Sequence, residues 1–194
     1  MRSDFIVRDD GFGQDTAIAE DIVLVEDGPE GSTHALRLSV VDGIVDTARW
    51  FGRMIPASNV ATEAFIRFAD EDCTAHLGVR LLGDDGYFAT ISTAGASVYR
   101  DEVELGDAAS VAAVDEWHRY RLYVRDESEG TRVCLQRWVE DDWVDLVNVV
   151  DDGDPPPVLG EAAFGFTLTS AAPNGPVIWF DEWRCYASPQ PEDA

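Results

Sequence analysis

The chain has 194 residues, of which 45% are hydrophobic, with six Trp, nine Phe and five Tyr. This length and composition suit one folded domain of ordinary size and exclude an intrinsically disordered chain. The 38 acidic and 14 basic residues give a formal charge of −24, which argues against nucleic acid and anionic membrane surfaces as partners.

The N-terminal stretch MRSDFIVRDDGFG has Asp4, Asp9 and Asp10 where a signal peptide would have its apolar region, so no signal peptide is visible. We therefore expect the protein to be made in the cytoplasm. Its expected location is the cytoplasm, or the surface of a virion if the protein belongs to a virus particle.

Short runs rich in Val, Ile, Phe, Tyr and Thr then recur along the chain, and clusters of Gly, Asp, Asn and Pro separate them. These runs predict strands at Phe5–Arg8, Ile22–Glu26, Ala35–Val40, Thr47–Met54, Ala61–Ala69, His76–Leu82, Tyr87–Ser92, Ser97–Val103, His118–Arg125, Arg132–Val139, Trp143–Val149, Ala163–Ser170 and Val177–Tyr186. The one candidate helix, Asp107–Glu116, is too short to form a layer. The pattern predicts an all-β fold, either an antiparallel sandwich or a closed barrel, over residues 1–187. The polar, Pro-containing segment 188–194 is expected to be a tail without a role in the core.

Five of the arginines fall on two of the expected strands, although the chain is so acidic. Period-two alternation places Tyr120, Leu122 and Val124 on one face and Arg119, Arg121, Tyr123 and Arg125 on the other. On the next strand Val133 and Leu135 point inward, whereas Arg132, Gln136 and Trp138 point outward. Upstream, Leu77, Val79 and Leu81 alternate with His76 and Arg80. If the three strands are neighbours in one sheet, the candidate ligand-binding residues are Arg80, Arg119, Arg121, Tyr123, Arg132, Gln136 and Trp138.

Two interpretations of this outer face remain open. Aromatic faces stack on sugar rings and the Arg fork binds carboxylate or sulfate, so the face could bind a glycan. Alternatively, each Arg pairs with Asp or Glu across strands and simply covers the sheet, because exposed ion pairs of this kind contribute only about 0–1 kcal/mol.

The other reactive side chains give no recognisable site. Cys73, Cys134 and Cys185 form no CxxC motif, which indicates buried free thiols and neither a zinc site nor a disulfide framework. Glu102 and Glu104 are two positions apart but lie beside a turn, and no nucleophile–base motif accompanies the histidines. We therefore expect no enzymatic activity.

All 14 basic residues are arginine. In roughly molar salt the Debye length falls to about 3 Å, so the self-repulsion of an acidic surface largely disappears. An acidic, lysine-free surface is similar to that of proteins from extremely halophilic archaea and their viruses. A high-GC genome would account for the arginines but not for the excess of acids.

The order of several segments resembles a known family. These segments are FIVRDDGF, EAFIRFAD, AHLGVRLLGDDGYFATIST, SVYRD, DEWHRYRLYV, RWVEDDWVDL, FGFTLTS and VIWFDEWRCYA. Together they resemble the concanavalin A-like lectin/glucanase domains, in particular the laminin G-like branch. The resemblance implies a two-sheet antiparallel jelly roll, a fold used by lectins, glycoside-binding modules, glycosidases and adhesive domains. The Glu-x-Asp-x-Glu pattern of the glucanase branch is missing.

The resemblance also implies a structural Ca²⁺ where the first and last strands meet. Asp9, Asp10 and Asp181 match those positions, and backbone carbonyls and water would have to complete a shell of six to eight oxygens.

Three functional hypotheses follow. The first is a non-catalytic, lectin-like domain of a halophile that binds a glycan or another cell-surface polymer. The alternative is a structural or adhesive component of a virion or surface assembly, which would bind copies of itself or other virion proteins. The third is a degenerate glycosidase.

Overall fold

The computed structural model describes residues 6–8, 20–25, 28–29, 32, 35–40, 49–55, 57–69, 71, 73–82, 85–109, 112–153, 160–168 and 177–187. Its strands are β1 (Ile6–Arg8), β2 (Glu20–Val25), β3 (Ala35–Val40), β4 (Arg49–Ile55), β5 (Val60–Phe68), β6 (Cys73–Leu82), β7 (Asp85–Ile91), β8 (Gly95–Arg100), β9 (Val103–Ala109), β10 (His118–Glu127), β11 (Gly130–Val139), β12 (Asp142–Asp151), β13 (Gly160–Leu168) and β14 (Val177–Ala187). The predicted Asp9, Asp10 and the tail 188–194 lie outside the described residues.

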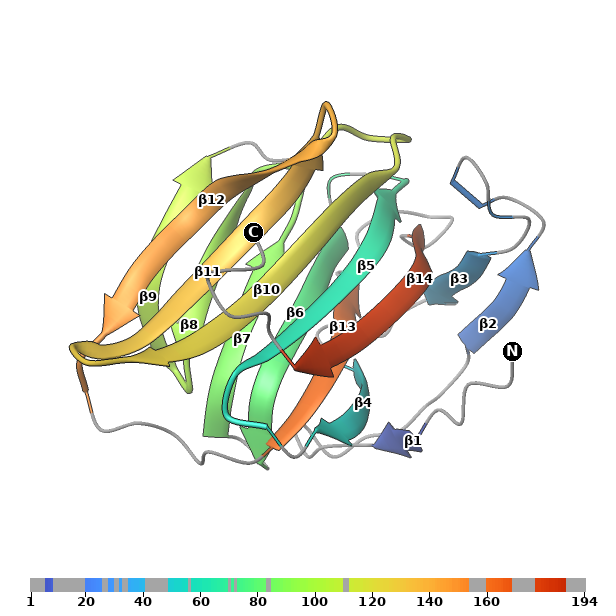
Figure 1. Cartoon of the computed structure of the whole chain (residues 1–194). Coiled ribbons are helices and arrows are strands. Elements are labelled where there is room, and N and C mark those ends of the chain that lie inside the picture. Colours follow the sequence, from blue (N-terminus) through green and yellow to red (C-terminus); the bar gives the residue numbers. More distant parts are fainter. Residues whose placement is uncertain are drawn as a thin grey trace.

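The described strands form two antiparallel sheets of seven strands each, packed face to face (Figure 1). One sheet has the order β12-β11-β10-β5-β14-β3-β2, and the other has the order β1-β4-β13-β6-β7-β8-β9. Figure 1 views the first sheet from its outer face, with the second sheet behind it. The predicted two-sheet antiparallel jelly roll is thus confirmed.

The core lies between the two sheets and follows the period-two alternation of the strands. Tyr120, Leu122 and Val124 of β10 and Val133 and Leu135 of β11 are all fully buried, as the alternation predicts. Burying a side chain of this size contributes roughly 1.5–3 kcal/mol. From β6 and β7 of the opposite sheet, the core receives Leu77, Val79, Ala89 and Ile91. Inward apolar side chains therefore fix which side chains of β10 and β11 face outward.

Every predicted strand overlaps an observed one, but β9 was not predicted. Its sequence VELGDAA lacks a hydrophobic alternation, and most of its side chains are exposed or half-buried. Pairing with β8 makes it a strand, in register from Gly95↔Ala109 to Arg100↔Val103. The predicted short helix at 107–116 is not present in its described residues, because 107–109 belong to β9 and Val114 forms a bridge with Phe68.

Within the described part of the chain, there is no helix with the length and apolar character needed to cross a membrane.

Candidate functional site

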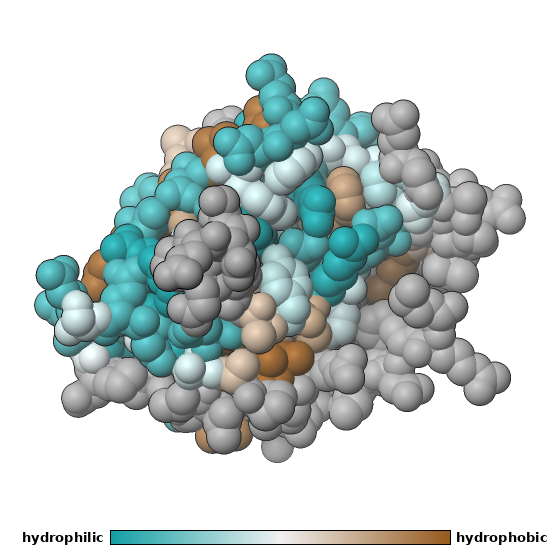
Figure 2. Space-filling model, viewed as in Figure 1, coloured by the Kyte–Doolittle hydropathy of each residue, from teal (hydrophilic) through white to brown (hydrophobic). Residues whose placement is uncertain are grey.

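Five strands, β14, β5, β10, β11 and β12, place a group of arginines and aromatic rings on the outer face of the first sheet. We call this group the arginine–aromatic face; its residues are Glu63, Phe65, Arg119, Arg121, Tyr123, Gln136, Trp138, Trp143, Asp145 and Tyr186. The strand registers bring them together, with Arg121 opposite both Glu63 and Gln136, and Gln136 opposite Asp145. Hydrophilic residues dominate the described part of this side of the molecule, with apolar residues only in small patches (Figure 2).

Aromatic rings surround two of the arginines. Trp138 and Trp143 lie opposite each other on the β11–β12 hairpin, with their rings 5.2 Å apart and nearly perpendicular. The Arg121 guanidinium lies 4.2 Å from the Trp143 ring centre, and the Arg119 guanidinium lies 5.2 Å from the same ring. Such cation–π contacts contribute roughly 0.5–2 kcal/mol each and hold the planar groups in place.

A tight turn fixes this pair of tryptophans. The two residues between β11 and β12, Glu140 and Asp141, both have positive φ, at 49° and 68°. Two left-handed residues in a two-residue hairpin loop define a type I′ turn, whose twist matches that of the flanking strands. The turn sets Val139 opposite Asp142, and therefore Trp138 opposite Trp143.

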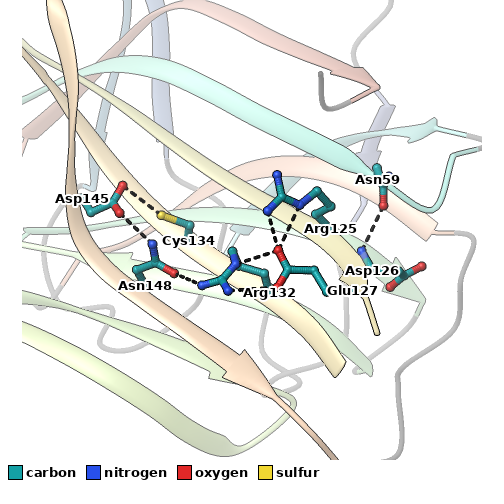
Figure 3. A network of polar contacts seen from close by, with 8 residues as sticks. All are labelled: Asn59, Arg125, Asp126, Glu127, Arg132, Cys134, Asp145 and Asn148. Carbon is teal, nitrogen blue, oxygen red and sulfur yellow. Dashed lines mark hydrogen bonds and ion pairs between the residues drawn. The ribbon is translucent and has the colours of Figure 1, made fainter. Parts of the chain in front are cut away.

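Hydrogen bonds connect the polar side chains of the face into one network. Arg121 Nε donates to Gln136 Oε1 at 2.9 Å, and Gln136 Nε2 donates to Asp145 Oδ1 at 2.7 Å. From Asp145 the network continues through Asn148 to Arg132, and Arg132 shares the Glu127 carboxylate with Arg125 (Figure 3). Most of these side chains have a fixed partner, so the face is ordered before any ligand arrives.

Glu63 is the buried acidic residue of the face. Its side chain is only 5% exposed and accepts hydrogen bonds from Arg119 at 2.6 Å and from the Tyr186 hydroxyl at 2.9 Å. A buried acid on β5 is tolerated because these partners compensate for its loss of solvation. Glu63 was not among the residues predicted from the sequence, and the signal that could have identified it is an acid on the outward side of a mostly apolar strand.

The carboxylates of the network stay ionised. Hydrogen bonds from Arg132 and Arg125 lower the pKa of Glu127 to about 2. Burial opposes ionisation of Asp145, but hydrogen bonds from Gln136 and Asn148 outweigh it, so the pKa of Asp145 is also lowered. These groups keep their negative charge throughout the neutral range.

The structure places six of the seven predicted ligand-binding residues on this one sheet. Arg119, Arg121 and Tyr123 lie on β10, and Arg132, Gln136 and Trp138 lie on β11. The prediction missed Trp143, Asp145 and Tyr186, besides Glu63 and Phe65. The two tryptophans that flank a short acidic turn in RWVEDDWVDL are the signal that could have identified Trp143.

Arg80 is the exception, and its predicted place on the common face was wrong. It lies on β6, in the opposite sheet, and is fully buried. A bulge between Val79 and Leu82 breaks the alternation there, and Arg80 has a φ of 54°. Its guanidinium donates to the Ser58 carbonyl and to Asp126 at 2.7 Å, so it ties the two sheets together. His76, expected to share the face, is also buried on β6.

Of the three predicted calcium ligands, Asp181 lies among the described residues. Asp181 lies on β14 beside Phe65, and its Oδ1 accepts the N–H of Glu182 at 2.7 Å. Its Oδ2 is buried and lacks a hydrogen-bond partner within the described residues. Nevertheless, among those residues no group of three or more His, Cys, Asp or Glu side chains could hold a metal ion.

The cysteines behave as small apolar residues. Cys73 and Cys134 are buried, Cys185 is half-buried, and all three are free thiols. Burial raises the pKa of the Cys134 thiol to about 12, so it stays protonated and unreactive.

No family model matches the sequence, and no curated protein matches it. Solved structures are similar to it. Cellulose induced protein Cip1 has a TM-score of 0.60 and 10% identity, covering 87% of this chain and 86% of that one. Peanut lectin has a TM-score of 0.55 and 10% identity, covering 86% of this chain and 88% of that one.

The exoplasmic/lumenal domain of VIP36, in a Ca²⁺/Man3GlcNAc-bound form, has a TM-score of 0.52 and 11% identity, covering 82% of this chain and 80% of that one. The catalytic domain of a GH131 beta-glucanase from Podospora anserina is also similar. Identities this low establish the fold alone. In fold, this chain is therefore a two-sheet antiparallel jelly-roll sandwich like that of lectins.

Proposed function

We propose that the protein is a non-catalytic, lectin-like domain that binds a glycan, or another cell-surface polymer, through the arginine–aromatic face. The observation that carries this proposal is the half-buried Trp138–Trp143 pair, placed within a network of ordered polar side chains. Sugars present apolar C–H faces beside hydroxyl groups, so they require aromatic rings and hydrogen-bonding groups side by side. The lectin-like fold supports the same conclusion only by analogy.

The positions of the carboxylates argue against hydrolysis on this face. Glu63 lies on β5 and Asp145 on β12, so three strand spacings separate them. At about 4.8 Å for each spacing, the two strands are roughly 14 Å apart. Glycosidases that use two carboxyl groups keep them about 5–9.5 Å apart. Glu104 on β9 accepts a hydrogen bond from Tyr99, and Glu102 lies in the preceding turn, so neither belongs to this face.

The acidic, lysine-free composition supports a halophilic origin for the protein. With 38 acidic residues and a charge of −24, the surface is suited to molar salt, where the repulsion between its carboxylates is screened. We propose that the domain functions in molar salt. We also propose that Asp181 contributes to a structural Ca²⁺ site.

Glycan binding can be tested with immobilised cell-surface glycans of halophiles in 3 M KCl. The Trp143→Ala variant is expected to lose at least about tenfold in affinity, because burying a large apolar side chain contributes roughly 1.5–3 kcal/mol. Trp179→Ala is the matched control, since Trp179 lies on the same sheet and stacks on Arg67 instead. If the wild type binds no glycan, or if both variants weaken binding equally, this function is wrong.

The alternative, a structural component of a surface assembly or virion, is favoured by one observation. Apolar side chains are exposed on β9 and β12, the terminal strands of the two sheets: Val103 is 54% exposed and Val144 is 46% exposed. Unpaired strand edges with apolar residues can associate with a second chain. Sedimentation in 3 M KCl tests this idea. A monomer at all concentrations would exclude self-assembly, whereas oligomers that Val144→Asp dissociates would support it.

A further inference from the structure

The arginines on the outer side of this sheet differ in their partners. Five of them bind a carboxylate: Arg67 binds Asp115, Arg119 binds Glu63, Arg125 and Arg132 share Glu127, and Arg184 binds Glu182. Arg121 differs from these five. Among the described residues, no carboxylate lies within ion-pair distance of its guanidinium, and its hydrogen bonds go to the amide oxygen of Gln136.

The neutral partners of Arg121 are themselves held by anions. Gln136 donates to Asp145, which orients its carbonyl oxygen toward Arg121. The Tyr186 hydroxyl, also within hydrogen-bonding reach of Arg121, donates to Glu63 at 2.9 Å. One face of the guanidinium lies against Trp143, 4.2 Å from the ring centre. The group is therefore held on several sides without a direct ion pair, a preorganisation that lowers the entropy cost of binding a ligand.

In this arrangement the positive charge of Arg121 and some of its N–H donors remain available to a ligand. The hydrogen bonds to Gln136 use two of the five N–H donors that a guanidinium has. A planar Arg fork matches the oxygens of a carboxylate or sulfate, and such charge-assisted bonds are about twice as strong as neutral ones. Trp143 and Tyr123 lie beside the fork, where the ring that carries the oxyanion would stack.

We propose that the ligand is an anionic glycan, whose carboxylate or sulfate group is bound by Arg121. This inference rests on the proposed function and names the substrate class of the same face. The negative charge of the whole protein does not oppose it in molar salt, because a Debye length of about 3 Å removes long-range repulsion and leaves contact hydrogen bonds. Nucleic acid would require a row of unpaired cations, and the neighbouring arginines on this sheet are bound to carboxylates.

The test compares a polyuronate with its carboxyl-reduced, neutral counterpart, and adds a sulfated polysaccharide, all in 3 M KCl. We expect the wild type to bind the polyuronate or the sulfated polymer at least tenfold more tightly than the neutral polymer. Arg121→Gln should remove this preference, and Arg121→Lys should restore only part of it. Arg125→Gln changes the net charge equally, but Glu127 keeps its bond to Arg132, so this control should retain the preference. Melting temperature in the same salt verifies that each variant is folded.

The outcomes separate the two proposals. Equal binding of charged and neutral polymers, reduced by Trp143→Ala, would overturn the anionic ligand and leave the glycan-binding function intact. If the protein binds neither these polymers nor the glycans of halophile cells, both proposals are wrong. A preference for the anionic polymer that Arg121→Gln abolishes and Arg125→Gln preserves would establish Arg121 as the residue that recognises the oxyanion.

Discussion

Single buried residues with charged or titratable side chains determine much of the behaviour of this sandwich. Glu63 and His76 are the clearest cases, since both are almost fully buried yet belong to opposite sheets. Glu63 accepts hydrogen bonds from Arg119 and Tyr186, whereas burial favours the neutral form of His76. Burial therefore has different consequences for the two residues: polar partners compensate for the burial of Glu63, whereas desolvation controls the pKa of His76.

Glu63→Gln should lower the free energy of unfolding by about 1–3 kcal/mol, because it leaves the Arg119 guanidinium without its carboxylate partner. Glu182→Gln provides the comparison, since the Glu182–Arg184 pair is exposed and should contribute less than about 1 kcal/mol. Denaturant titrations in molar salt measure both changes. Equal losses for the two variants would show that the burial of Glu63 has no energetic significance.

His76 should make the protein sensitive to mild acid. Desolvation lowers its pKa from 6.5 to about 4, so between these pH values the unfolded chain binds a proton that the folded chain does not. Stability is therefore highest above pH 6.5 and falls as the pH decreases toward 4, by up to roughly 3 kcal/mol. The slope of unfolding free energy against pH from 6.5 to 5 measures this effect. His76→Gln should flatten the slope, and an unchanged slope would assign it to other groups.

At the level of elements, the β11–β12 turn combines local strain with a functional position. Glu140 and Asp141 both adopt a left-handed backbone, which costs a residue with a Cβ roughly 1 kcal/mol each. The sequence preferred for such a turn is Asn-Gly. This turn nevertheless sets the register that places Trp138 opposite Trp143.

Replacing Glu140 and Asp141 by Asn and Gly should therefore raise the free energy of unfolding by about 1 kcal/mol or more, without loss of glycan binding. Asp142→Gly, one residue later in the extended strand, should instead lower the free energy of unfolding, since glycine weakens a strand. Chemical denaturation of the two variants gives the sign of each effect. Destabilisation by the Asn-Gly turn would mean that the present turn makes contacts of its own.

At the level of the whole molecule, the sandwich has a strongly acidic composition. Arg80 joins its two sheets. The formal net charge of the chain is −24, and all 14 of its basic residues are arginine. In dilute buffer the carboxylates repel each other over roughly 10 Å, whereas in molar salt they act only on near neighbours. The repulsion favours the expanded, unfolded chain.

The melting temperature should therefore rise by several degrees or more between 0.1 M and 3 M KCl. Calorimetry at both salt concentrations measures the change. Equal melting temperatures would contradict the proposed halophilic origin. Arg125→Gln makes the charge more negative, and in dilute buffer it should lower the melting temperature more than it does in molar salt.

The sequence alone determined the fold class, the inner and outer faces of β10 and β11, and the free state of the cysteines. These features depend on period-two alternation and turn residues, which are local. Tyr120 and Leu122 point inward for the same reason that Arg119 and Arg121 point outward. The strand β9 was missed because its pairing with β8, and not its own pattern, makes it a strand.

Only the tertiary structure decided which strands are neighbours and which partner each arginine has. Arg80 and Arg121 look alike in the sequence, yet a bulge buries the first between the sheets and the register of β10 exposes the second to Gln136 and Trp143. Strand order depends on contacts between residues far apart in the chain, such as Glu63 with Arg119 and Tyr186. Local alternation carries no information on these contacts, because it specifies a face without specifying what lies across it.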